Sequence, residues 1–283
     1  MFKQVTIIGP GLLGASLVLA IRKKHLAEKI VVWARSDKSA QDALDQLPVD
    51  RVEKNPSASV EGSNFVILCT PVETINSILS SIVGELKQGC LVTDVGSVKG
   101  RVCGEASDLF KNRNACFIGS HPMAGSEKSG MAHASENLFL NRPCIITPED
   151  EESSEQIKVL KLFWEKLGMQ NIIMTPEIHD RQLSEISHLP HLISSTLAHS
   201  LSEKTDDARS MCGQGLRDTV RIAGGSPELW TGIIQQNQAN VLSSLEKFQT
   251  SMEKVRSYIS QNNFDGLREF LETGANFQKE INK

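Results

Sequence analysis

The chain has 283 residues, of which 40% are hydrophobic and 23% are charged, and its formal net charge is −4. A chain of this length can form one large domain or two of ordinary size. The mild charge and the aromatic content of only 5% give no reason to expect nucleic acid or a membrane surface as a partner. No run approaches the roughly 18 apolar residues of a membrane-spanning helix, and we see no cleavable leader before the first predicted strand.

The cysteines indicate a reducing compartment. Six are scattered along the chain, and no two form a C-x-x-C pair. Most lie in apolar runs or at their edges, which is typical of reduced, buried thiols. We therefore expect a cytoplasmic protein, with no redox or zinc role for its cysteines.

A glycine-rich motif follows a β-branched run at residues 4–8. Its sequence is Gly9-Pro10-Gly11-Leu12-Leu13-Gly14, a G-x-G-x-x-G that opens an apolar helix predicted for residues 12–20. A strand before the motif and a helix after it form the context that predicts dinucleotide binding, rather than a glycine turn without a ligand. In that role the glycines allow a tight turn, close approach of a pyrophosphate and close packing of the helix. The predicted cofactor contacts are Gly9, Gly11, Leu12, Leu13 and Gly14.

The end of the second predicted strand, residues 30–33, bears on which dinucleotide binds. An NAD-binding unit usually has Asp or Glu there to hold the ribose hydroxyls, whereas this chain has Arg35 and Ser36. A guanidinium cannot accept a hydrogen bond from a hydroxyl, but it can pair with a 2′-phosphate, to which Ser36 can also donate. These residues favour NADP. Asp37, two residues further on, leaves NAD open, and Arg35 as a solvated surface residue is the alternative.

Further apolar runs predict the rest of a parallel sheet. The runs at residues 64–69 and 91–93 are expected to be buried strands, and the turns after them carry Thr70, predicted to line the cofactor cleft, and Ser97. The runs at 144–146 and 171–174 suggest strands that extend the same sheet, with a helix over 155–167 between them. Lys99 is either a surface residue or a phosphate or substrate contact.

A histidine motif gives the second functional signal. Gly119-Ser120-His121-Pro122-Met123-Ala124-Gly125-Ser126-Glu127 follows an apolar run at residues 115–118. We expect that run to be a strand of the parallel sheet and His121 to lie in the loop at its carboxyl end, where open α/β sheets bind ligands. The hydroxyl of Ser97 is expected at the same edge.

The pattern changes after Thr175-Pro176. No strand-like run appears again, and apolar residues recur at helical spacing to the end of the sequence. The fold class is therefore α/β, with a Rossmann dinucleotide-binding domain over residues 1–174 and an all-helical domain over 175–283. Such a helix set on a dinucleotide domain suggests a homodimer.

Two polar clusters lie in the helical half. His188-Leu189-Pro190-His191 places two histidines three residues apart, but no nearby carboxylate or cysteine completes a metal site, so we predict no metal and a packed or exposed His191. Further on, Arg217 and Arg221 share a helix face. Guanidinium groups grip carboxylates bidentately, which suits a dianionic substrate; a surface ion pair with Asp218 or Glu228 is the alternative.

Several of these motifs together resemble the prephenate/arogenate dehydrogenases of tyrosine biosynthesis. They are the glycine turn, residues 94–100, the histidine motif at 119–127, residues 188–191 and residues 217–223. The resemblance runs from about Lys3 to at least Trp230. It implies a Rossmann domain followed by a helical dimerisation domain, and oxidative decarboxylation of a cyclohexadienol with hydride transfer to NAD or NADP. Many members carry Asp at the position of Arg35, and this departure favours NADP over NAD as the cofactor.

The resemblance also implies the catalytic residues. His121 would polarise or deprotonate the ring hydroxyl, and Ser97 would help to place the hydroxyl and the imidazole. The chemistry agrees, because hydride loss leaves electron demand on the carbon that bears the hydroxyl, where a base assists. Histidine titrates near pH 6.5, so His121 can be neutral at the working pH.

The remaining site residues are likewise implied by the resemblance. Arg221 would hold a substrate carboxylate, and His188 would line the same pocket. Glu127 and Asp218 would form a polar pair that shapes the entrance. Trp230 would reach the pocket of the partner subunit. The side chain of the substrate stays open between the keto group of prephenate and the amine of arogenate.

Two other functions compete with this interpretation. A 3-hydroxyacid or imino-acid oxidoreductase shares the two-domain plan, but such enzymes usually place a catalytic lysine on a long helix. A cofactor-sensing regulator would keep the nucleotide fold, but it would not need Ser97, His121 and Arg221 together.

Overall fold

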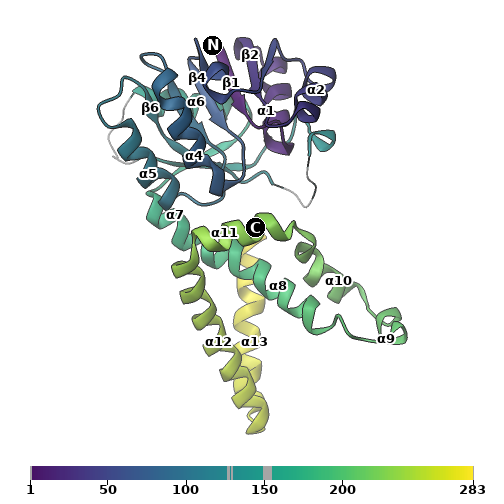
Figure 1. Ribbon diagram of the computed structural model, residues 1–283. Coiled ribbons are helices and arrows are strands. Elements are labelled where there is room, and N and C mark those ends of the chain that lie inside the picture. The colour runs from purple at the N-terminus through teal and green to yellow at the C-terminus, as the bar shows by residue number, and fades with distance from the viewer. Residues whose placement is uncertain (1, 126–127, 129, 149–154, 283) are drawn as a thin grey trace. The chain divides into compact units, whose positions relative to one another are not determined.

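A computed structural model describes residues 2–125, 128, 130–148 and 155–282 of the chain. The chain divides into two compact units, residues 1–237 and 238–283. The first unit contains both β-sheets and the second consists of helices (Figure 1). The domain boundary predicted after residue 174 lies just past the last strand, which ends at Ile173, and does not coincide with the boundary between the two compact units. It stays a prediction.

A six-stranded parallel sheet forms the centre of the first unit, with the strand order β3-β2-β1-β4-β5-β6. Its strands are β1 Phe2–Ile8, β2 Ala27–Trp33, β3 Arg51–Glu53, β4 Phe65–Leu68, β5 Leu91–Asp94 and β6 Cys116–Phe117. Strand β1 pairs with both β2 and β4, so the order of the strands reverses beside β1. Ligands bind at the carboxyl ends of the strands at such a switch point. The predicted Rossmann sheet is confirmed.

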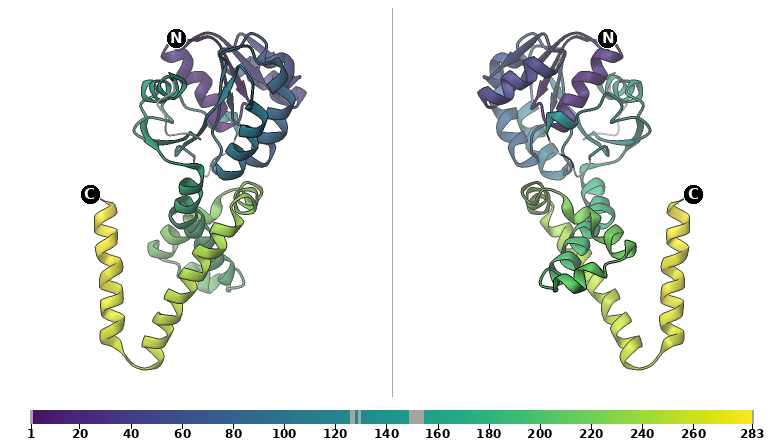
Figure 2. Two further views of the ribbon diagram at one scale, coloured as in Figure 1. Left: turned by 90° about the vertical axis from the view of Figure 1, so that its left-hand side faces the viewer. Right: turned by 90° about the vertical axis from the view of Figure 1, so that its right-hand side faces the viewer.

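Helices cover both faces of this sheet (Figure 2). They are α1 Leu12–Lys23, α2 Asp37–Gln46, α3 Pro56–Val60, α4 Val72–Ile82, α5 Gly100–Phe110 and α6 Glu155–Lys166. Phe65 and Ile67 of β4 join a core that contains α1 and α6. Val66 and Leu68 join a second core that contains α4 and α5. Successive strand residues point to opposite faces, which is why a strand buried on both sides is apolar throughout.

A second sheet carries His121. Its strands are β7 Gly119–Pro122, β8 Pro143–Thr147 and β9 Gln170–Ile173, in the order β7-β8-β9. Strand β7 runs antiparallel to β8, and His121 pairs with Ile145. The prediction that His121 lies in a loop is therefore wrong, and so is the prediction that the two later runs extend the parallel sheet. Short apolar runs indicate a strand but not its partner, because pairing depends on distant segments.

The remainder of the first unit is helical in the structure, as predicted. Its α-helices are α7 Pro176–Leu183, α8 Leu189–Ser200, α9 Asp206–Ser210, α10 Gln214–Val220 and α11 Pro227–Gln236. A π-helical turn, Ser184–His188, joins α7 to α8. Such turns are frequent at functional sites, and this one ends on a residue that the sequence singles out.

The second unit consists of α12 Gln238–Ser260 and α13 Phe264–Ile281. No residue of α13 is buried within the chain. Its exposed apolar side chains include Leu271 and Phe277, each 61% exposed. Exposed apolar side chains grouped on one helix are typical of surfaces that associate with another molecule. In the described part of the chain, no helix combines the length and apolar character needed to cross a membrane.

Candidate active site

The turn between β1 and α1 has room for a pyrophosphate. Gly9 has a φ of +98°, and a Cβ on Gly14 would lie 2.0 Å from the Gly9 carbonyl oxygen. A Cβ on Gly11, by contrast, would meet no atom within 4 Å. Gly11 is the N-cap of α1, and no side chain caps this helix. The space beside Gly11 and the amide groups at the start of α1 therefore suit phosphate oxygens.

Thr70 lies beside the glycine turn. Its methyl carbon would be 2.9 Å from a Cβ on Gly9. Its hydroxyl oxygen is buried and has no hydrogen-bond partner among the described residues. A buried hydroxyl without a partner costs about 1–3 kcal/mol, so this atom points to a bound group as its partner. The residues around the turn thus fit a dinucleotide.

The three polar residues that follow β2, residues 35–37, differ in their exposure and in their bonding partners. Arg35 is exposed, and it makes no ion pair with the residues that the structure describes. Ser36 is the N-cap of α2, where its hydroxyl oxygen accepts the N–H of Ser39 at 3.1 Å. Asp37 already has a cationic partner, since its Oδ1 lies 2.6 Å from Nζ of Lys54. The hydrogen bond from Lys54 lowers the pKa of the Asp37 carboxyl.

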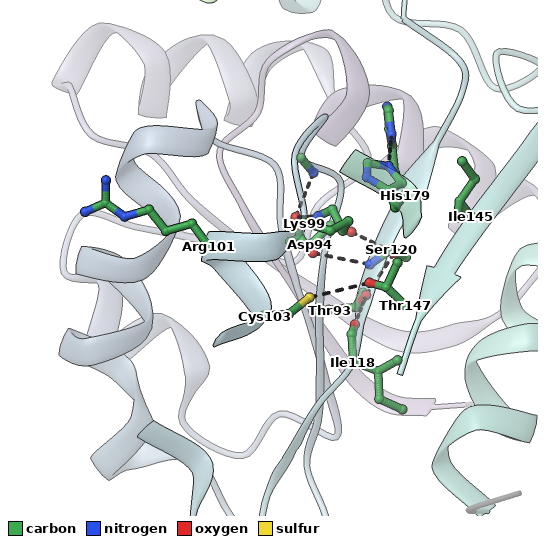
Figure 3. Close-up of polar contacts among 12 residues, drawn as sticks. Thr93, Asp94, Lys99, Arg101, Cys103, Ile118, Ser120, Ile145, Thr147 and His179 are labelled. Carbon is green, nitrogen blue, oxygen red and sulfur yellow. Dashed lines mark hydrogen bonds and ion pairs between the residues drawn. The ribbon is translucent and has the colours of Figure 1, made fainter. Parts of the chain in front are cut away.

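A buried ion pair closes the loop that carries Ser97. The side chains of Asp94 and Lys99 form an ion pair, which Figure 3 shows. Neither side chain has exposed surface. The Asp94 carboxylate also accepts the N–H groups of Gly96 at 2.8 Å and Ser120 at 3.2 Å. Lys99 is therefore not a surface residue. Its ammonium group neutralises Asp94 and fixes the turn between β5 and α5.

The end of β5 also positions His121. The hydroxyl of Ser120 donates to the backbone oxygen of Asp94 at 2.7 Å. This hydrogen bond connects β7 to β5 at the residue that precedes His121. His121 is 7% exposed. Burial, reinforced by the nearby His179 and Lys99, holds its pKa well below the ordinary histidine value. A lowered pKa favours the neutral ring, the state in which the imidazole can take up a proton.

A cavity of about 350 Å³ within the first unit brings together five of the predicted residues. They are Ser97, His121, His188, Arg221 and Trp230. Lys128 and Ser187 also line this cavity, although no sequence motif indicated them. Arg221 and Lys128 place two cationic side chains in the same space as a neutral imidazole. Such a space suits a substrate with two carboxylates and a proton to lose.

The histidines of the helical segment have distinct surroundings. His188 is 1% exposed, and its Nδ1 lies 3.2 Å from Nδ2 of Asn237, which donates to it. Burial lowers the pKa of His188 to about 4. His191 stacks on Trp230 with ring centroids 3.6 Å apart and an angle of 8° between the planes. His191 is thus a packed helix residue, as one of the two predicted alternatives stated.

Two of the described candidate residues do not line this cavity. Asp218 lies on an exposed part of α10, where its Oδ1 accepts a hydrogen bond from Gln214 at 2.7 Å. Arg217 is exposed on the same helix and does not line the cavity. Glu127 lies outside the described residues. Trp230 lines the cavity of its own chain, and its predicted reach into a partner's pocket stays a prediction.

His179 and Asp180 were not predicted as site residues from the sequence. Both lie in α7, which begins at Pro176 after the Thr175 N-cap. His179 is 58 positions from His121 in sequence, yet their ring nitrogens lie 2.9 Å apart. The only signal in the sequence was a histidine followed directly by an aspartate near the start of a helix. Such a pair does not by itself distinguish a functional site from ordinary polar residues at a helix end.

Dinucleotide-dependent hydride transfer needs a base and substrate-binding groups beside the carboxyl edge of the nucleotide fold. This molecule combines a nucleotide-binding sheet with a cavity lined by a histidine, a serine and cationic side chains, an arrangement that fits a nicotinamide-dependent dehydrogenase. Two domain families match the chain: the prephenate dehydrogenase nucleotide-binding domain over residues 17–173 and the prephenate dehydrogenase dimerization domain over residues 175–273. The chain belongs to the prephenate dehydrogenase family and is an oxidoreductase of that family.

Individual relatives agree with this assignment. The chain is 32% identical to the prephenate dehydrogenase of Bacillus subtilis, over 98% of this chain and 76% of the relative. A crystal structure of A. aeolicus prephenate dehydrogenase with hydroxyphenyl propionate and NAD+ is 29% identical, with a TM-score of 0.91 and 99% coverage of both chains. Synechocystis arogenate dehydrogenase is 30% identical, with a TM-score of 0.84 and coverage of 99% of this chain and all (100%) of that one.

Proposed function

We propose that this protein is a prephenate dehydrogenase, which converts prephenate to 4-hydroxyphenylpyruvate and carbon dioxide while it reduces NAD(P). The observation that carries the proposal is the shared cavity of His121, Ser97 and Arg221. It combines a neutral base, a hydroxyl and a carboxylate-binding cation. A cofactor-sensing regulator would have no use for this combination.

In the proposed reaction His121 accepts the proton of the ring hydroxyl as the hydride leaves the same carbon. When bound, the nicotinamide supplies the hydride acceptor. The ring carboxylate then departs as carbon dioxide, its electron pair completes the aromatic ring, and the proton on His121 returns to the phenolate oxygen. No net proton is released. Ser97, which lines the same cavity, would hold the hydroxyl in line with the imidazole.

Two carboxylates of the substrate need two cationic partners. Arg221 and Lys128 supply them in the proposed complex, and Arg221 offers bidentate contacts. The buried ring of His188 and the half-buried Trp230 form the wall of the cavity. A neutral wall is what a cyclohexadiene ring requires, because it carries no charge of its own.

We propose NADP as the favoured cofactor, with NAD as the alternative. Arg35 is exposed and unpaired within the described chain, so a 2′-phosphate would provide its missing partner. Ser36 lies at the start of α2, where the helix dipole favours negative charge. The carboxylate of Asp37 is occupied by Lys54, which leaves it less suited to hold ribose hydroxyls.

We also propose that the protein is a homodimer whose nucleotide-binding domain ends near residue 174. The family match over 175–273 is to a dimerization domain, and α13 buries none of its residues within one chain. Sedimentation velocity tests the dimer. Phe277→Glu is expected to shift the protein toward monomer, whereas Lys279→Gln on the same helix is not.

An arogenate dehydrogenase is the second candidate, because the similar Synechocystis structure has that activity in its name. A two-by-two assay decides among these functions: prephenate or arogenate is combined with NAD or NADP, and reduced nicotinamide is measured. We expect the highest kcat/KM with prephenate and NADP. A preference for arogenate would replace the proposed substrate, and no turnover with any pair would support the regulator.

A further inference from the structure

Three side chains form a buried line that leads away from the cavity. Nδ1 of His121 lies 2.9 Å from Nε2 of His179. Nδ1 of His179 in turn lies 2.7 Å from Oδ1 of Asp180. The three residues are 7%, 0% and 5% exposed. Water therefore cannot compete for these hydrogen bonds, and each ring nitrogen in the line must be matched by its neighbour.

The carboxylate end of the line has only acceptor atoms. Oδ1 of Asp180 accepts the N–H of Lys99 at 2.8 Å, and Oδ2 accepts the N–H of Gly100 at 2.8 Å. These two bonds from the start of α5 use both oxygens of the carboxylate as acceptors. The short contact to His179 therefore requires a proton on Nδ1 of that ring, because an ionised carboxylate cannot donate one.

The proton on His179 determines where His121 carries its own. Burial lowers the pKa of both rings, so each is neutral and has one N–H. With its proton on Nδ1, His179 has only a lone pair on Nε2 and must accept there. Nδ1 of His121 is then the donor. Nε2 of His121 is left with an available lone pair.

We propose that His179 and Asp180 are positioning residues that hold His121 in the tautomer with its proton on Nδ1 and its lone pair on Nε2. The tautomer follows from the hydrogen bonds among two buried neutral rings and the Asp180 carboxylate, and its use as a base rests on the proposed function. In the opposite tautomer Nε2 would carry a proton and could not accept one from a substrate hydroxyl.

Asp180 has a second connection to the site. Its bonds to Lys99 and Gly100 hold the loop after β5, which carries Ser97. Its backbone oxygen accepts a hydrogen bond from Asn237 at 2.7 Å. Replacing Asp180 would thus disturb the loop as well as the tautomer. His179 makes the cleaner test, because its ring nitrogens connect His121 to Asp180.

The test compares His179→Gln with His179→Leu. The glutamine amide oxygen can still accept from Nδ1 of His121, whereas leucine has a similar size and no polar atom. Ring nitrogens of ¹⁵N-histidine-labelled, ligand-free protein report directly which nitrogen carries the proton. We expect the wild type and the glutamine variant to have His121 protonated on Nδ1, and the leucine variant to show both tautomers. Exposed His133 is the matched control site, and its signal should not change.

Turnover provides the second readout. His179→Leu should lower kcat about 100-fold, within the range for a positioned base, with little change in the KM for the cofactor. His179→Gln should recover most of that loss. A proton on Nε2 of His121 in the wild type would overturn the proposal, as would equal kcat values for two folded variants.

Folding is monitored by thermal melting. If the leucine variant does not fold, the proposal is judged from the His121 tautomer in the wild type and in the glutamine variant. A proton on Nδ1 of His121 in both proteins supports the proposal, and a proton on Nε2 in either contradicts it. The tautomer is measured without substrate or cofactor. A protein that turns over neither prephenate nor arogenate would thus refute the proposed function and leave the tautomer result standing.

Discussion

The carbonyl oxygen of Gly9 lies 2.0 Å from the point where a Cβ on Gly14 would sit. This distance is far below van der Waals contact, and the obstructing atom belongs to the backbone, which has little freedom to move. Gly11 lies between these two residues, yet a Cβ there would meet nothing within 4 Å. The two glycines of one motif therefore differ physically: at Gly14 the backbone leaves no room for a side chain, whereas the space beside Gly11 is open and could hold the proposed cofactor.

Alanine substitutions should distinguish these two positions. Gly14→Ala is expected to lower the free energy of unfolding by about 1–3 kcal/mol, the usual cost of overpacking. Gly11→Ala should melt at the wild-type temperature but bind the cofactor more weakly. Thermal melting and cofactor titration measure the two effects. Normal cofactor affinity in Gly11→Ala would contradict the assignment of this space to the pyrophosphate.

His121→Asn tests the proposed base. Asparagine keeps a polar group in the cavity but cannot accept a proton at neutral pH. We expect kcat to fall by about 10²–10⁴, the contribution of a general base, while cofactor affinity stays nearly unchanged. Steady-state kinetics and cofactor titration provide the measurement, with His133→Asn as the control. A loss of cofactor affinity comparable to the loss of kcat would remove His121 from the base role.

Arg221→Ala tests the carboxylate contact. A hydrogen bond to a charged group contributes about 1.5–3 kcal/mol, which corresponds to a rise of roughly 10- to 100-fold in the substrate KM. The KM for the cofactor should change little. Arg113→Ala, at an exposed arginine that does not line the cavity, is the matched control. An unchanged substrate KM in Arg221→Ala would show that this guanidinium does not bind the substrate.

Arg35→Ala tests the choice of cofactor. Removal of the guanidinium should weaken NADP much more than NAD, because only NADP has a 2′-phosphate for it to bind. NAD serves as the control within the same protein. Dissociation constants for both cofactors in the wild type and the variant decide the matter, and equal losses for the two would refute the role of Arg35.

The buried histidines predict how stability depends on pH. Burial lowers the pKa of His121, His179 and His188, the last to about 4. Unfolded histidine titrates near 6.5. As the pH falls below that value, the unfolded chain takes up protons that the folded protein does not, so the folded protein loses stability. Urea unfolding at pH values from 7 toward 4 should show a falling free energy, with a shallower slope in His188→Asn. If the free energy of unfolding fell equally steeply with pH in the wild type and in His188→Asn, a lowered pKa of His188 in the folded protein would be contradicted.

Local features of the chain were predictable from the sequence. Strand β1, the glycine turn and α1 follow from contiguous apolar periodicity and backbone requirements. Short motifs also identified Ser97, His121 and Arg221, which line one cavity. The three-residue strand β3 was not identified. It pairs with β2 over Arg51 to Glu53, and a run this short has no clear period.

Only the tertiary structure decided which segments meet. It placed His121 in an antiparallel pair with β8, buried Lys99 against Asp94 and brought His179 and Asp180 into a hydrogen-bonded line with His121. It also left Asp218 away from the cavity. The physical reason is that backbone preference and apolar spacing act over a few neighbouring residues, so the sequence determined the strand, turn and helix signals. Pairing, burial and proton location depend on side chains that only folding brings together.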